Sequence, residues 1–339
     1  MAGLALAALA GSLALPFTHG LAGAARAHPG PDHNLTNHAT AFLSMLDTSQ
    51  RRRAVRPFDD DDRFSFTWLP GTRGGVALKA MTGDQRNALR DLLRAVLSQK
   101  GSLMVDRVMA TEAALAVLEN APSYRDPAKY YIALFGSPQS GKRWALRFEG
   151  HHLSVNLTFN GDTLVSATPF FIGANPETIP AGPDKGVRAM AAQIDAAWAL
   201  FEALDAKQKR LAANDNEWFG GFLTRPDQRR ANLGRPAGIT YAQLMPAQRR
   251  LLRTLIATHV RLTRPAFARQ AMALLDQRAQ RESLRFYWNG AKTRGGGSFY
   301  WRVTGKRILI EQDGMNRGRH VHGIWRDPAN DFGDASRAP

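Results

Sequence analysis

Two stretches of the chain share one pattern, an amphipathic helix followed later by a strand unit, and this likeness limits the fold more than any other feature. The helix patterns cover residues 78–93 and 243–256, with apolar side chains at helical spacing in both. In the strand units the same spacing recurs in two sets of residues, which are Trp144, Arg147, Gly150, Leu153, Val155 and Phe299, Arg302, Gly305, Ile308, Ile310. Two related halves would explain the likeness, and coincidence between short amphipathic patterns is the alternative.

We therefore expect an α+β fold with two pseudo-repeated halves, about residues 63–180 and 187–333, whose helices pack on antiparallel strands in one compact unit. The chain has 339 residues, of which 44% are hydrophobic, so it can bury a large core. Residues 173–186 are rich in Gly and Pro and predict a loop between the halves, and a helix is expected from about 187 to 213. Residues 220–238 are expected to form a long loop.

The regions outside residues 63–333 give weaker signals. Residues 51–53 are all arginine and residues 59–62 are all aspartate, and we interpret residues 28–62 as an extended, solvated segment. Residues 334–339 are expected to be a disordered tail.

The N-terminus resembles an export signal. Residues 2–17 are almost purely apolar, the first charge is Arg26, and the small residues Ala25 and Ala27 around it fit a signal-peptidase site. We interpret residues 1–27 as this signal and expect a periplasmic or extracellular protein, with the start inside a longer, twin-arginine signal or a buried N-terminal helix as alternatives. No later segment has the run of about 20 apolar residues that a membrane span needs.

Charge and cysteine content narrow the partners and the chemistry. The formal net charge is +16, and most of the basic residues are arginine, which favours carboxylate and phosphate partners. For an exported protein this indicates a small molecule or an anionic envelope ligand and disfavours nucleic acid, while a merely solvated basic surface is the alternative. The chain has no cysteine, which excludes disulfides, thiolate catalysis and cysteine-ligated metals.

Two histidine clusters are the strongest site candidates. His320 and His322 alternate within a predicted strand and should share one face, while neighbours His151 and His152 should point to opposite faces of another strand. One of the first pair could then join the second pair, and we predict His152, His320 and His322 as ligands of Zn or Cu, with His151 and Asp331 as alternates. The alternative is that these histidines only form hydrogen bonds between strands. If export cleaves the chain after Ala27, His28 would be a second, terminal copper chelate.

Other polar residues near the histidines in the sequence complete the hypothesis. Glu149 and Asp327 are candidate catalytic residues, and Arg147, Asn156 and Arg326 are candidate ligand-binding residues. The leading hypothesis is a metal-dependent hydrolase or oxidase. The alternative is a non-enzymatic binding protein for an anionic envelope ligand, in which the histidines and arginines contact the ligand without a metal.

Several ordered blocks resemble one known family. They are EGHHLSVN at 149–156, TP at 168–169 with GANP at 173–176, and HVHGIWRDP at 320–328 with DFG at 331–333. Together they are similar to the bacterial family of domain of unknown function 3500, over about residues 40–333. Arg319 departs from the pattern, where a polar residue such as Asn or His is expected. The resemblance implies a single large exported domain and no established activity.

Overall fold

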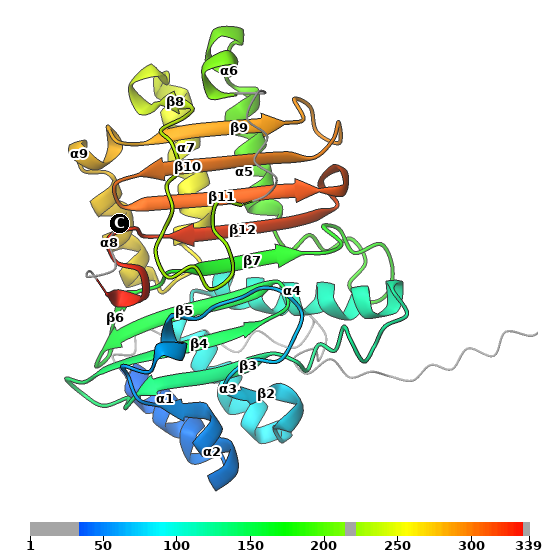
Figure 1. Ribbon diagram of the computed structural model, residues 1–339, viewed down its shortest axis with the longest axis vertical. Coiled ribbons are helices and arrows are strands. Elements are labelled where there is room, and N and C mark those ends of the chain that lie inside the picture. Colours follow the sequence, from blue (N-terminus) through cyan, green and yellow to red (C-terminus); the bar gives the residue numbers. More distant parts are fainter. Residues whose placement is uncertain (1–33, 214–221, 335–339) are drawn as a thin grey trace, which may run out of the picture.

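A computed structural model of the protein describes residues 34–213 and 222–334, and one large sheet dominates it (Figure 1). Ten strands follow one another in the order β1-β3-β4-β5-β7-β12-β11-β10-β9-β8, while β2 pairs with β3 and β6 with β5. All of these pairings are antiparallel except the short parallel pairing of β1 with β3. The strands are β1 (Val55–Arg56), β2 (Val76–Ala77), β3 (Tyr131–Gly136), β4 (Arg143–Gly150), β5 (Leu153–Asn160), β6 (Thr163–Ser166), β7 (Phe170–Ala174), β8 (Ile239–Thr240), β9 (Arg285–Gly290), β10 (Phe299–Gly305), β11 (Ile308–Met315) and β12 (His320–Arg326).

The α-helices lie mainly behind the sheet in the view of Figure 1. They are α1 (Leu35–Ser44), α2 (Thr48–Ala54), α3 (Gly83–Val96), α4 (Gln99–Leu118), α5 (Ala191–Glu202), α6 (Ala206–Ala212), α7 (Pro246–Val260), α8 (Pro265–Leu275) and α9 (Arg278–Arg281). Short 3-10 turns are η1 (Asp61–Phe64), η2 (Leu78–Ala80), η3 (Tyr241–Gln243), η4 (Asn316–Gly318) and η5 (Asp331–Gly333). The mixed helix and strand content and the large sheet agree with the prediction. No helix within residues 34–213 or 222–334 combines the length and the apolarity that crossing a membrane requires.

The two faces of the sheet differ in polarity, as the alternation along β5 indicates. Leu153, Val155, Leu157 and Phe159 belong to the main hydrophobic core, to which the helices also contribute. The residues between them, Ser154, Asn156 and Thr158, are polar and equally buried. They are buried because two segments without regular strands cross the front of the sheet, residues 57–75 (the first strap) and 222–238 (the second strap) (Figure 1).

The straps add a small apolar cluster of their own on this polar face. It contains Phe64, Phe66, Trp68, Phe171, Ile324 and Phe332, with Phe222 packed against it. The straps also contact each other, because Asp227 N donates to Phe66 O at 2.8 Å and Phe66 N donates to the Asp227 carboxylate at 3.1 Å. The loop expected at residues 220–238 is thus confirmed from residue 222 onward, and it covers the sheet.

The N-terminal segment corrects one expectation. Residues 28–62 were predicted to be extended, but α1 and α2 occupy much of this range, and Leu35, Ala39, Phe42 and Leu43 enter the main core. The prediction was wrong because it weighed the charged blocks and overlooked this helical spacing of apolar residues. Residues 1–27 and 335–339, where the signal and most of the tail were expected, lie outside the described residues.

The helix expected over 187–213 is also two helices in the structure. The side chain of Asp205 accepts a hydrogen bond from Gln208 N and starts α6 with a capping box, so the chain breaks after α5.

β7 and β12 are neighbours in the middle of the sheet, and the chain is arranged similarly on either side of them. β3, β4 and β5 follow on one side, and β11, β10 and β9 on the other. Arg147 of β4 is opposite Asn156 of β5, and Arg302 of β10 is opposite Glu311 of β11. Two-residue turns close both hairpins, after Gly150 and after Gly305.

Candidate metal centre

His151 and His152 form the two-residue turn between β4 and β5. His152 has a φ of 62°, a left-handed conformation that is uncommon for residues other than glycine. Two backbone hydrogen bonds hold it, because His152 N donates to Trp68 O at 3.0 Å and His152 O accepts from Gly173 N at 2.7 Å. The two imidazole rings stack with centroids 3.6 Å apart. The expectation that they lie in a strand and point to opposite faces is therefore wrong, because the alternation of a strand does not extend into its turn.

The turn brings His152 to the two histidines at the start of β12. His152 Nε2 and His320 Nε2 lie 2.9 Å apart, and the His320 and His322 ring centroids lie 4.4 Å apart. One ring nitrogen from each of the three residues falls within 4.8 Å of the others, so the group could hold a metal ion. The alternation predicted for His320 and His322 is confirmed, and so is their convergence with His152 across about 170 residues of sequence.

A glycine on β7 makes room for these rings. Gly173 is opposite His322 in the pairing of β7 with β12. A Cβ atom on Gly173 would lie 3.0 Å from the His152 ring and 3.1 Å from the His322 ring. Any larger residue would push the two imidazoles apart, so this position maintains the geometry of the group.

Burial favours the neutral form of His152 and of His320. His152 is 2% exposed and His322 is 8% exposed, while His320 is half-buried. Burial, reinforced by the neighbouring histidines, lowers the pKa of His152 well below its ordinary value. The same causes lower the pKa of His320 to about 3. A neutral imidazole has the nitrogen lone pair that a metal requires.

Asp313 on β11 orients the third histidine. His322 Nδ1 lies 3.0 Å from Asp313 Oδ1, and both side chains are about nine-tenths buried. A carboxylate that accepts from Nδ1–H fixes the tautomer and leaves Nε2 as the metal-binding atom. Sequence reasoning missed Asp313. Its position two residues beyond the buried Glu311 on an alternating strand was the available signal.

A second group of polar residues lies against the first. Glu112 of α4 hydrogen-bonds to His151 Nδ1, and Arg125 lies 3.4 Å from the His151 ring nitrogens and forms an ion pair with Glu119. Glu112, His151 and His152 also have ligand atoms within 4.8 Å of one another. The positive charge of Arg125 beside His151 disfavours a cation there, so we interpret Glu112 and Arg125 as the residues that position the turn. Glu112 was also missed, although a carboxylate inside the apolar run of α4 is an unusual feature.

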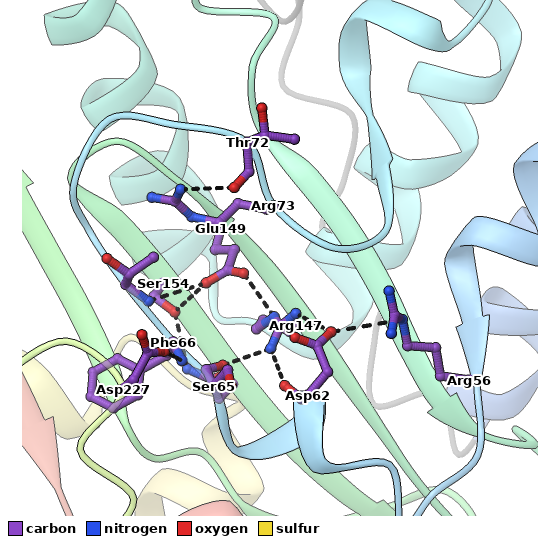
Figure 2. A network of polar contacts seen from close by, with 12 residues as sticks. Arg56, Asp62, Ser65, Phe66, Thr72, Arg73, Arg147, Glu149, Ser154 and Asp227 are labelled. Atoms are coloured by element: carbon purple, nitrogen blue, oxygen red, sulfur yellow. Dashed lines mark hydrogen bonds and ion pairs between the residues drawn. The ribbon is translucent and has the colours of Figure 1, made fainter.

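Arg147 and Glu149, predicted to bind ligand and to catalyse, instead attach the first strap to the sheet (Figure 2). Their side chains form an ion pair at 2.8 Å. Arg147 also donates to Ser65 O at 2.6 Å and to the Asp62 carboxylate at 2.7 Å. Burial raises the pKa of Glu149, although the guanidinium groups of Arg147 and Arg73 oppose this. Neither residue belongs to the histidine group.

The remaining candidates lie at the far end of β12 or bind other parts of the protein. Arg326 Nε donates to Asp331 Oδ2 at 2.7 Å, and Asp327 forms an ion pair with Arg307. Arg326 lies six positions after His320 along β12, about 20 Å at the rise of a β-strand. Asp331 is therefore not an alternate ligand of this group, and Asp327 is too distant to act beside it. Asn156 donates to Pro169 O at 2.9 Å and takes part in the structure of the polar face.

Comparison with known proteins identifies a family and no function. The model of a family described as protein of unknown function (DUF3500) matches residues 30–334, so the chain belongs to this family. The family domain therefore begins near residue 30, well before residue 63. No curated protein and no solved structure matches the chain significantly.

Proposed function

We propose that this DUF3500 member is a metal-dependent enzyme whose centre is formed by His152, His320 and His322. One observation carries the proposal. His152 Nε2 and His320 Nε2 face each other at 2.9 Å, beside a third imidazole that Asp313 orients. In a tetrahedral site with bonds of about 2.0 to 2.1 Å, neighbouring ligand nitrogens are about 3.4 Å apart. A small opening of the first pair would therefore admit an ion.

The donor set indicates which metals and which chemistry. Three imidazole ligands suit Zn or Cu, and three protein ligands leave a coordination position for water or substrate. Such a metal supplies either an activated water for hydrolysis or a redox centre for oxidation. His320 is the most exposed of the three ligands, so the open position is expected on its side. The residues of the chain hold the imidazoles in place, Asp313 through His322 and Glu112 through the turn.

The alternative function, an anion-binding protein without a metal, loses the contacts predicted for it. Arg147, Asn156 and Arg326 are buried and bonded to other parts of the protein. Their polar atoms are buried, and those without a hydrogen-bond partner among the described residues, such as Arg326 Nη1 and Nη2, are closed off from solvent.

Metal content tests the proposal. The protein is stripped with a chelator, loaded separately with Zn²⁺ and Cu²⁺, desalted and analysed by elemental mass spectrometry. We expect one ion per chain in the wild type and almost none in His320→Ala or His322→Ala. Asp313→Asn should weaken metal binding by about 10- to 100-fold, because it removes the carboxylate that orients His322. His38→Ala on α1 is the control. Full metal retention in both ligand variants would overturn the proposal.

We also propose that the protein is exported, with residues 1–27 as the signal. The apolar run at 2–17 and the small residues around Arg26 support this. Mass spectrometry of the mature protein should find a new N-terminus near His28. A cytoplasmic protein that keeps Met1 would contradict it.

We propose further that the two halves arose from a duplication. The matched turns after Gly150 and Gly305 support this, and so do two similar pairs of buried glutamines, Gln50 with Gln85 and Gln208 with Gln248. In a crystal structure, superposing α3 and β3–β5 on α7 and β9–β11 should place Arg147 on Arg302. A different strand order or direction in the two units would refute the duplication.

A further inference from the structure

Four arginines line a groove at one end of the central strands, on the face of the sheet that the helices cover. Its volume is about 620 Å³, within the range of about 300 to 1,000 Å³ that small-molecule sites occupy. The groove is bounded by the loop after β7, by α5 and by the turns that follow β9 and β11. In Figure 1 these turns and the end of β7 lie along one side of the sheet, as does the start of β12.

The charged residues that line the groove are Arg188, Arg294, Arg317, Arg319 and Glu177. Two of the arginines are fixed by acidic neighbours. Arg188 donates to both carboxylate oxygens of Asp195 at 3.0 and 3.1 Å, and Arg294 donates to Asp195 at 3.1 Å and to Glu202 at 2.9 Å. The charge of these two arginines is therefore largely compensated by the neighbouring carboxylates.

The other two arginines are available to a ligand. Arg317 and Arg319 are exposed and form no ion pair with any residue in the described part of the chain. The turn that carries them is held in an uncommon conformation, because Asn316 and Arg317 have φ angles of 50° and 60° and Gly318 has 79°. Arg319 O also accepts from Glu177 N at 2.7 Å, which ties this turn to the opposite side of the groove. The fold thus holds two uncompensated guanidinium groups at the groove.

The groove and the histidine group lie on opposite faces of the sheet. Trp198 and Phe299, which belong to the main core on the helix side, line the groove, whereas His322 contacts Phe171 and Phe222 of the apolar cluster beneath the straps. We propose that the groove binds a small anionic ligand through a carboxylate or a phosphate group. Guanidinium groups bind both anions through paired, charge-assisted hydrogen bonds. This proposal stands apart from the proposed metal centre, because no histidine within the described residues lines the groove.

A second groove makes a strict comparison possible. It has a volume of about 570 Å³ and is also lined by four arginines, Arg249, Arg250, Arg253 and Arg281, between α7 and α8. Arg249 donates to backbone oxygens and Arg253 to the Asp276 carboxylate. No histidine in the described part of the chain lines this groove either. If any arginine-lined groove on this basic protein attracted anions equally, Arg250 would matter as much as Arg317.

Calorimetric titration of the full-length, metal-loaded protein tests the proposal with three probes, inorganic phosphate, digalacturonate and the neutral disaccharide maltose. The variants are Arg317→Gln and Arg319→Gln, with Arg250→Gln as the matched control. We expect at least one of the two anions to bind the wild type, with an affinity that falls as salt rises, and maltose not to bind. Each groove variant should bind that anion about tenfold more weakly, while the control binds as the wild type.

The outcomes of these titrations distinguish the chemical groups that the groove could bind. Binding of phosphate alone assigns a phosphate group, and binding of digalacturonate alone assigns a carboxylate. Binding of neither anion, or an equal loss in Arg250→Gln, would overturn the proposal. Metal content measured on the same samples separates the groove proposal from the metal-enzyme proposal. Anion binding by a protein that holds no metal would contradict the metal-dependent enzyme and support the anion-binding groove. Unchanged melting temperatures confirm that the variants fold.

Discussion

The two halves of the chain place similar elements on either side of β7 and β12, yet they differ in the side chains at matching positions. The hairpin turn of the first half is His151-His152, and that of the second half is Lys306-Arg307. Only the first turn contributes to the metal group, and its partners His320 and His322 come from the second half. The comparison teaches that similar elements on both sides of β7 and β12 supply the sheet, while the proposed three-histidine centre lies where the two sides meet.

The core beneath the sheet shows the same contrast. Gln85 and Gln248 each occupy the third position of a helix, and eleven residues later stand Val96 in the first half and His259 in the second. Leu157 and Gln312 match in the same way, four residues after the start of β5 and β11. Neither Gln312 amide atom nor His259 Nε2 has a hydrogen-bond partner within the described residues. The second half therefore tolerates polar groups where the first half is apolar.

The largest difference in the stability lost on substitution by alanine is expected between the matching positions Glu311 and Asn156. Glu311 accepts hydrogen bonds from Leu223 N, Thr224 N, the Thr224 hydroxyl and the Tyr300 hydroxyl, at 2.6 to 3.0 Å. Removing it leaves these donors buried without a partner, so we expect Glu311→Ala to lower the free energy of unfolding by about 4 kcal/mol. Asn156→Ala should cost about 1 to 2 kcal/mol, because among the described residues Asn156 donates only to Pro169 O and Ser154 Oγ. Urea unfolding measures both, and equal losses would show that the second strap is not held by this carboxylate.

The next largest expected effect is a pH dependence of the free energy of unfolding that arises from His259. Burial lowers its pKa to about 4, from 6.5 in the unfolded chain. The unfolded state therefore takes up a proton first, and stability that is complete above pH 6.5 falls as the pH drops through this window. The shift corresponds to about 3 kcal/mol.

His259→Val copies the first half at this position and should remove that contribution. Between pH 7 and pH 4.5 the variant should lose about 2 to 3 kcal/mol less unfolding free energy than the wild type. The change in side-chain volume is the same at both pH values, so the difference isolates the imidazole. Parallel pH profiles for the two proteins would contradict this explanation.

The smallest difference in the stability lost on substitution by alanine is expected between the two capping glutamines, Gln85 and Gln248. Gln85 accepts from Thr82 N and donates to Met45 O, and Gln248 accepts from Met245 N and donates to Ala203 O. Because the bonds match, Gln85→Ala and Gln248→Ala should each cost about 2 kcal/mol and agree within about 0.5 kcal/mol. A disagreement above about 1 kcal/mol in urea unfolding would mean that the halves differ here too.

Much of the fold could be predicted from local patterns. The spacing of leucines predicted α3 and α7, and the alternation of β5 predicted its apolar and polar faces, because both follow from the geometry of one element. The alternation of His320 and His322 was predicted for the same reason. The straps escaped prediction as structural parts, since covering a polar face depends on contacts between distant residues such as Arg147 and Ser65.

The convergence of the three histidines was predicted, whereas the residues that contact them were missed. His151 and His152 were predicted to lie in a strand, because the sequence around them continues an alternating pattern. The pairing of Gly150 with Leu153 shows that these two residues form the turn between β4 and β5. Glu112 and Asp313 come from α4 and β11, and no sequence spacing links them to the histidines. Arg147, Glu149 and Arg326 were chosen as polar residues near the histidines in sequence, but burial directs such residues to partners inside the protein.

X-ray absorption spectroscopy of the metal-loaded protein tests the central claim, a three-histidine centre where the halves meet, most directly. For the zinc form we predict about three imidazole nitrogens at about 2.0 to 2.1 Å and one further light ligand, with the outer-shell scattering typical of imidazole. His320→Ala should lose one imidazole or the metal altogether. A shell of oxygen ligands without imidazole scattering would contradict the account and place the ion elsewhere on the protein.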